Sequence, residues 1–367
     1  MAKLGECFSV IRNGASIRQT DGAGGFPITR IETIADKTIN REKFGYAEIY
    51  DLAQYRDYIL QDGDILMSHI NSEKHLGKVA LYSKQDDEQI IHGMNLLMLR
   101  ADTQKVIPEY AKYYFESQKF LRQIGRITKK SVNQASFTVT ALKELEIPLA
   151  SIIVQRDISE KLKKVDWLVS LRKQQLAKLD ELVKARFVEM FGDPYVNNKH
   201  YPLRKGESFF KLSNGKGVPE DKRLSNGVPA YGGNGISWYT NESLFNYDTI
   251  VVGRVGFQSG NVHIAKGPLW ITDNAMYMSS CDFSQYNLIF LINLMEHIDF
   301  TRFQDAGDLK KITQKPFMQY EYLCPPLSLQ NQFAAFVERV NQQKQTVQQS
   351  LEKLELMKKA LMQEYFG

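Results

Sequence analysis

The sequence predicts an α+β protein made of two similar halves, each an α/β domain followed by one long helix. First, residues 147–192 are repeated without a gap at the end of the 367-residue chain, with Gln155 matching Gln330 at an offset of 175 residues. Second, the segments before the two copies carry short apolar runs and turn signals in the same order. Because a repeat of this length determines the architecture, two halves are expected rather than three unrelated domains.

The composition is that of a soluble globular protein. Apolar residues make up 43% of the chain and charged residues 24%, which argues against a disordered chain. A net charge of +5 permits a polyanionic partner without requiring one. The three cysteines and six histidines show neither disulfide-framework nor zinc-ligand spacing, so no metal site is expected. Without a signal peptide or a membrane-length apolar run, the chain is expected to be cytoplasmic and to contact no membrane.

The first half begins with short strands and turns. Residues 64–68 form an apolar run after an Asp-Gly turn and predict a buried strand, with 77–82 as its partner. Pro108 then opens a predicted helix over 108–126, since proline is tolerated in the first helical turn. Ala111, Tyr114, Phe115 and Leu121 are expected on one face of this helix.

The second half repeats this order with shorter loops. Residues 248–253 correspond to 64–67, and 260–262 correspond to 77–79. The offset between the halves is 201 residues at Asn13 and Asn214 and decreases to 175 at the repeated segment. Loop shortening of this kind is tolerated because loops lie at the surface.

The repeated segment predicts a long helix with a narrow apolar seam. From Ile158 onward, apolar residues recur three and four positions apart, the spacing of a helix that packs against another helix. About 33 helical residues at ~1.5 Å each give a rod of about 50 Å. Arg172 and Lys344 interrupt the seam, each matched by a valine in the other copy, and are interpreted as register-fixing residues. The predicted helix and subunit interface comprises Leu162, Val165, Val169, Arg172, Leu176, Leu179, Val183, Val337, Val340, Lys344, Val347, Leu351, Leu354 and Leu361.

The two junctions that precede these helices carry a family resemblance. Residues 145–158 and 324–333 resemble the I-P-L-P-P-L-x-x-Q-x-x-I junction of type I restriction-modification specificity subunits. The Phe-Gly endings at Phe191-Gly192 and Phe366-Gly367 are similar to that family as well, as is the segment 227–235. The resemblance covers essentially the whole chain, although Ala150-Ser151 stands where the family has its proline pair.

This resemblance implies a pseudo-twofold molecule that recognises DNA. It implies target recognition domains at 1–150 and 196–326, joined by spacer helices at 151–195 and 327–367 that form an antiparallel coiled coil. Each domain is expected to read one half of a bipartite, asymmetric double-stranded DNA site, so that the protein lies on the nucleoid when bound. The implied partners are two modification subunits, which carry S-adenosylmethionine and methylate adenine, and two motor-nuclease restriction subunits. No cofactor is expected on this chain; ATP and Mg²⁺ are expected on the partners.

Basic residues precede the junction in both halves and suggest where DNA binds. Lys129-Lys130 and Lys310-Lys311 suit phosphates, and nearby amides suit base edges. A solvated loop remains the alternative for the first segment. The expected DNA contacts are Ser68, Asn71, Lys74, Lys78, Arg126, Lys129, Lys130, Asn133 and Gln134, and in the second half Tyr231, Asn234, Arg254, Gln258, Ser259, Asn261, Lys310 and Lys311.

The sequence predicts no catalytic residue. A methyltransferase would need a glycine-rich cofactor loop and a [DNS]-P-P-[YFW] element, and residues 193–195 fall one proline short. A nuclease would rest on the charge cluster 220–222 alone, and no G-x-S-x-G nucleophile elbow is present. The alternatives to a DNA-recognition subunit are a helical scaffold that never binds DNA and, less favoured, a methyltransferase.

Overall fold

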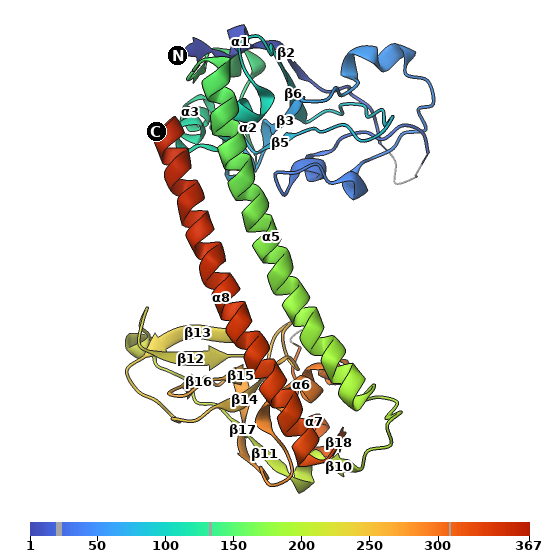
Figure 1. Ribbon diagram of the computed structural model, residues 1–367, viewed down its shortest axis with the longest axis vertical. Helices are drawn as coiled ribbons and strands as arrows, with labels where there is room; N and C mark the ends of the chain where they lie inside the picture. Colours follow the sequence, from blue (N-terminus) through green and yellow to red (C-terminus); the bar gives the residue numbers. More distant parts are fainter. Residues whose placement is uncertain (20–23, 132–133, 308–309) are drawn as a thin grey trace. The chain divides into compact units, whose positions relative to one another are not determined.

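The computed structural model describes residues 1–19, 24–131, 134–307 and 310–367 (Figure 1). The chain divides into two compact units. Unit 1 comprises Met1–Arg172 together with Ser350–Gly367, and unit 2 comprises Lys173–Gln349. Each unit therefore contains one mixed α/β region and portions of both long helices. The predicted contact Asn133 lies outside the described residues.

Unit 1 is built on a four-stranded antiparallel sheet in the order β2-β6-β3-β5. Ile65 of β3 faces Leu81 of β5, which confirms the predicted strand pair. All four residues of β3 are buried because Ile65 and Met67 join one apolar cluster while Leu66 joins another on the opposite face. The strands are β1 (Ala2–Lys3), β2 (Phe8–Asn13), β3 (Ile65–Ser68), β4 (Ile70–Asn71), β5 (Val79–Leu81), β6 (Leu96–Ala101), β7 (Lys129–Lys130), β8 (Ala135–Ser136) and β9 (Glu146–Ile147).

The helix predicted over 108–126 is two helices, α2 (Pro108–Glu116) and α3 (Gln118–Ile127). Ser117 separates them: its backbone is extended and its Oγ accepts a hydrogen bond from the Phe120 N–H at 3.2 Å, which caps α3. Leu121 is 36% exposed, so it does not share the buried face expected for it. Unit 1 also contains α1 (Leu4–Cys7), α4 (Val139–Lys143) and the short 3₁₀ helices η1 (Ile31–Ile34), η2 (Arg41–Lys43), η3 (Ala53–Tyr58) and η4 (Glu73–His75).

Unit 2 repeats the topology of unit 1. Its four-stranded sheet has the order β11-β17-β14-β15, in which these strands take the places of β2, β6, β3 and β5. We call β3 and β14 the central strands of their units. A second sheet, β13-β12-β16, lies in the same unit, and β10 pairs with β18 as β1 pairs with β9. The strands are β10 (Leu203–Lys205), β11 (Phe210–Asn214), β12 (Val228–Gly232), β13 (Gly235–Thr240), β14 (Thr249–Gly253), β15 (Val262–Ala265), β16 (Trp270–Ile271), β17 (Ala275–Cys281) and β18 (Glu321–Leu323). Its shorter helices are η5 (Gly206–Ser208), η6 (Glu220–Lys222), α6 (Leu288–Glu296), η7 (Phe300–Phe303) and α7 (Lys315–Gln319).

The repeated segments form α5 (Ile152–Phe191) and α8 (Leu327–Phe366), each 40 residues long. At ~1.5 Å per residue each is about 60 Å long, longer than predicted because α5 begins six residues before Ile158. Both end at a glycine with φ of +77°, Gly192 and Gly367, a left-handed conformation that stops a helix without strain.

The two long helices lie antiparallel within each unit. In unit 1, Lys358 pairs with Asp166 and Ser350 with Arg172. In unit 2, Lys344 pairs with Asp180 and Phe333 packs against Phe187, so within each unit numbers rise along α5 as they fall along α8. The α+β class with an antiparallel helix pair is confirmed. All fourteen residues of the predicted seam are buried or half-buried, whereas Trp167 on another face of α5 is 60% exposed.

The far end of each long helix completes an aromatic core. Phe366 at the end of α8 packs against Tyr110 and Tyr114 in unit 1, with ring centroids 5.3 and 5.8 Å apart. Phe191 at the end of α5 packs against Phe290 in unit 2 at 4.6 Å. Within the described ranges, no helix combines the length and apolar character that crossing a bilayer requires.

Candidate nucleic-acid interface

In unit 1, a small three-stranded sheet of order β4-β8-β7 brings together three of the predicted contacts, Asn71, Lys129 and Lys130. Asn71 of β4 and Lys130 of β7 both face Ala135, the β8 residue between them. Only His69 separates the end of β3 from the start of β4. The His69 carbonyl accepts a hydrogen bond from the Phe137 N–H, just after β8, at 3.2 Å. Residues distant in sequence are thus brought beside one another.

The basic side chains of this sheet point to solvent. Lys130 Nζ lies 2.7 Å from Glu73 Oε1, but both side chains are about two-thirds exposed, at 66% and 65%, so the ion pair is weak. Lys78 differs: it is half-buried, and its Nζ donates to the Ala35 carbonyl at 3.1 Å. The exposed members of the predicted set are Lys74, Arg126, Lys129, Lys130 and Gln134.

Ser68 is buried and positions its neighbour. It is 2% exposed, and its Oγ accepts a hydrogen bond from Asn71 Nδ2 at 3.4 Å. The buried His69 ring lies beside Phe137, with centroids 6.2 Å apart. Burial lowers the pKa of His69 to about 4, so this ring is neutral near pH 7. Ser68 thus supports Asn71, and its burial argues against the direct DNA contact expected for it.

Unit 2 makes a comparable pairing after its central strand, from different residues. Here Val255, after the central strand β14, faces Lys311 in an antiparallel bridge. The Ile312 N–H donates to the Arg254 carbonyl at 3.0 Å, as Phe137 does to His69 in unit 1. Ile312 and Phe137 are both buried, at 2% and 3% exposure, and exposed lysines stand nearby in each unit. The position beside the segment that follows the central strand is therefore taken by Ala135-Ser136 in unit 1 and by Lys310-Lys311 in unit 2, whereas Lys129-Lys130 lie one strand further out.

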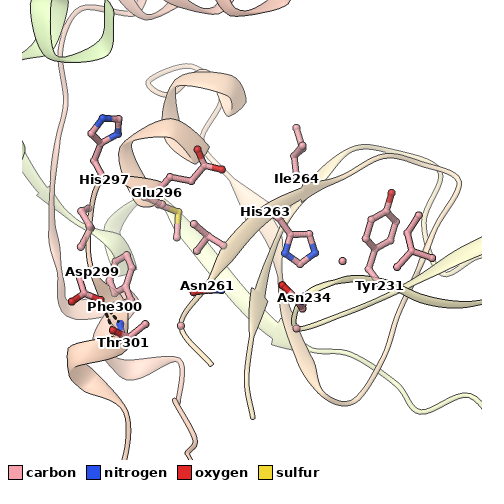
Figure 2. A pocket seen from close by; sticks show the side chains of 17 residues that line it. Tyr231, Asn234, Asn261, His263, Ile264, Glu296, His297, Asp299, Phe300 and Thr301 are labelled. Carbon is pink, nitrogen blue, oxygen red and sulfur yellow. Dashed lines mark hydrogen bonds between the residues drawn. The ribbon is translucent and has the colours of Figure 1, made fainter. Parts of the chain in front are cut away.

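Three of the remaining predicted contacts of the second half line a cavity of about 630 Å³ (Figure 2). Tyr231, Asn234 and Asn261 line it together with Glu296 and Asp299. Amide and phenol groups suit base edges, whereas the two carboxylates would repel a phosphate. The cavity therefore suits polar base atoms better than the sugar-phosphate backbone.

Other predicted residues of unit 2 lie away from the cavity lining. Arg254 is half-buried, and its Nη1 donates to the Asp273 carbonyl at 3.3 Å. Gln258 accepts a hydrogen bond from Asn261, so the two amides hold each other. Ser259 is fully buried, which argues against the direct DNA contact expected for it. Among the residues that the structure describes, no cluster of histidine, cysteine or acidic side chains could hold a metal ion.

Comparison with known proteins identifies the family. The family model for the type I restriction modification DNA specificity domain matches residues 1–181. The putative type I restriction enzyme MjaX specificity subunit of Methanocaldococcus jannaschii is 30% identical, covering 98% of this chain and 91% of that protein. The chain belongs to the type I restriction-modification specificity subunits. The Escherichia coli EcoKI specificity subunit is 22% identical over 49% of this chain and 40% of that protein.

Solved structures share the fold of this specificity subunit. The type I restriction-modification S subunit from M. genitalium has a TM-score of 0.66 at 16% identity, covering 100% of this chain and 95% of that one. A chain from a structural study of complex assembly and conformational transition in the type I system has a TM-score of 0.57 at 14% identity, covering 100% and 96%. The family predicted from the junctions is confirmed, and with it a non-catalytic DNA specificity subunit that works with partner subunits.

Proposed function

We propose that this specificity subunit reads a bipartite, asymmetric DNA site, one half with each unit. The observation that carries the proposal is that each unit holds exposed lysines close to the segment that follows its central strand. Lys311 pairs directly beside that segment in unit 2, and Lys129-Lys130 lie one strand further out, on β7, in unit 1. Phosphate contacts fix a protein on DNA, and base contacts provide the sequence preference. Because the side chains around the two segments differ, the two half-sites should differ in sequence.

The proposed division of the chain follows its repeats. Residues 1–150 and 196–326 are the recognition domains, and 151–195 and 327–367 are the spacers. Helices of fixed length suit this role because paired DNA-reading modules depend on half-site spacing, near whole helical turns of about 34 to 36 Å. The helices would then determine the number of base pairs between the half-sites, while the domains determine their sequences.

The proposed partners are two modification subunits and two motor-nuclease subunits. S-adenosylmethionine, ATP and Mg²⁺ would be bound by those partners, and this chain would supply only recognition. Exposed residues on α5, such as Trp167 and Lys178, leave helix surface available to another chain. Native mass determination of the purified complex tests the stoichiometry. Methyl transfer to DNA by the isolated chain would contradict the absence of catalysis.

Mapping N6-methyladenine across the host genome tests the proposed reading of DNA. We expect a single motif with two different half-sites and a spacer of constant length, which disappears when this chain is deleted. A continuous or palindromic motif would contradict two different reading units. Unchanged methylation after deletion would favour a scaffold that does not bind DNA.

A further inference from the structure

The junction glutamine of unit 1 holds the first turn of α5 against the recognition region. Gln155 is fully buried. Its Oε1 accepts a hydrogen bond from the Ile107 N–H at 2.9 Å, and its Nε2 donates to the Lys105 carbonyl at 2.9 Å. The same Nε2 donates to the Ala150 carbonyl at 2.9 Å, just before the helix begins. One side chain therefore joins two chain segments with all of its hydrogen-bonding capacity in use except one acceptor site.

Gln330 makes the same three hydrogen bonds in unit 2. It is also fully buried, and its Oε1 accepts from the Asn287 N–H at 2.8 Å. Its Nε2 donates to the Gln285 carbonyl at 2.9 Å and to the Pro325 carbonyl at 2.8 Å. As in unit 1, the donor N–H belongs to the N-cap residue of a helix, α6 here and α2 there. In both copies the first two partners stand two residues apart and the third stands five residues before the glutamine, while the glutamine follows its N-cap partner by 48 residues in unit 1 and by 43 in unit 2.

These bonds restrain motion between a domain and its helix. The contacts at Ile107 and Lys105 bind the segment that leads from the central sheet into α2, whereas the contact at Ala150 binds the chain entering α5. Buried amide hydrogen bonds are directional, so three of them on one side chain restrict both rotation and sliding of the helix. An asparagine is too short to span the same partners, and a carboxylate lacks the two donors.

We propose that Gln155 and Gln330, here named the junction glutamines, are positioning residues that set the orientation of each recognition domain on its spacer helix. They thereby restrict the spacer length that the subunit accepts between its half-sites. This inference rests on the proposed reading of a bipartite site. A glutamine that served only to fold the junction would affect the amount of native protein, not the choice of spacer.

The first experiment measures spacer choice. Full-length Gln155→Leu and Gln330→Leu, each in complex with the modification subunits, are titrated with duplexes carrying the mapped half-sites and the natural spacer or one base pair more or less. Leucine has a similar size and removes all three hydrogen bonds. Because one buried hydrogen bond contributes enough to change an equilibrium severalfold, we expect discrimination between spacers to fall about 3- to 10-fold. The half-site base preference should stay unchanged.

The control variants are Gln174→Leu and Gln349→Leu. These residues also match each other in the two helix copies, but both are exposed. They should keep the wild-type spacer choice. Equal spacer discrimination in the wild type and in folded variants of the junction glutamines overturns the proposal.

A second experiment needs no DNA and tests the restraint itself. Spin labels at Gln85→Cys and Lys164→Cys, both exposed positions of unit 1, report the distance between recognition region and helix in the full chain after the native cysteines are replaced. Gln155→Leu should broaden this distance distribution. A broadened distribution in a protein that binds no DNA supports the restraint while the proposed function fails. An unchanged distribution, or loss of native protein in the variants of both glutamines, overturns the proposal.

Discussion

Lys344 Nζ on α8 lies 2.5 Å from Asp180 Oδ1 on α5, so a cation within the apolar seam has an acidic partner on the facing helix. The other polar seam residue, Arg172, donates from Nε to Ser350 Oγ at 3.2 Å. In the aligned repeat, each of these residues is matched by a valine. Because the helices are antiparallel, residues matched in the repeat do not face each other, and each polar side chain meets a polar partner instead.

We expect the pair of Lys344 and Asp180 to contribute little to stability. Their side chains are 34% and 55% exposed, so water and salt screen the attraction. Asp180→Ala should lower the free energy of unfolding by about 0.2 to 1 kcal/mol, as is typical of exposed ion pairs. A double-mutant cycle of Asp180→Ala and Lys344→Ala measures the coupling energy, with each free energy of unfolding determined by urea denaturation. The exposed Lys359→Ala is the control. A coupling near 3 kcal/mol would show that the pair is effectively buried.

Removal of the Phe366 ring should destabilise unit 1. This side chain is 2% exposed and packs in the same cluster as Tyr110 and Tyr114. Phe366→Ala should cost about 3 to 5 kcal/mol, the usual cost of deleting a buried aromatic ring. Hydrogen exchange measured by mass spectrometry should show faster exchange in α2. The control is Leu356→Ala on the same helix, where the side chain is 66% exposed and exchange should not change.

The basic segments should govern salt-dependent affinity for any DNA. Alanine at Lys129, Lys130, Lys310 or Lys311 removes one phosphate-neutralising charge, so fewer counterions are released on binding. The slope of log affinity against log salt should become shallower by about one unit per contact, with equal weakening on specific and random duplexes. Fluorescence anisotropy across a salt series measures this slope. Identical slopes for the wild type and all four variants would favour the scaffold alternative.

Residues at or near the unit 2 cavity should govern base preference instead. Asn234 is exposed at the turn between β12 and β13 and lines the cavity. If its amide makes a bidentate base contact, Asn234→Ala should reduce discrimination at one base pair by about 1 to 3 kcal/mol. The same shift is expected for alanine at Tyr231, Arg254 or Gln258. Selection from a randomised half-site measures it, with the exposed Asn226→Ala as control, and uniform weakening on all sequences would assign these residues to the backbone.

The repeat and its junctions predicted most of the fold because both can be recognised in the sequence itself. The offset between Gln155 and Gln330, and the seam spacing along α5 and α8, needed no tertiary information. The break at Ser117 escaped prediction because the apolar spacing continues across it, while a single hydroxyl cap starts the second helix. The cavity was not predicted either. Two of its lining residues, Glu296 and Asp299, come from the end of α6 and the loop after it, and their spacing in the sequence matches no known motif. Burial of Ser68 and Ser259 depended on packing that polarity alone does not indicate.

Acid should destabilise unit 1 through Glu88. Arg41 donates to both carboxylate oxygens, from Nη2 at 2.6 Å and from Nε at 3.0 Å, and Tyr82 donates at 3.0 Å. Chiefly the hydrogen bonds from Arg41 lower the pKa of Glu88 to about 2. A carboxyl group whose pKa is lowered by folding contributes stability above its unfolded pKa, and this contribution is lost as pH falls through the folded value. The window therefore lies between about pH 4.5 and 2, with a loss of about 2 to 3 kcal/mol.

Comparison of Glu88→Gln with the wild type isolates this contribution. The buried His92 and His69, with pKa values lowered to about 3 and about 4, also favour the folded protein only while neutral. Their contribution is lost from about pH 6.5 downward in both proteins, so it cancels in the difference. Urea midpoints measured from pH 7 to pH 3 should fall less steeply for Glu88→Gln than for the wild type below pH 4.5, with the exposed Glu32→Gln matching the wild type. Parallel pH profiles for all three proteins would show that Arg41 does not hold the ionised carboxylate in solution.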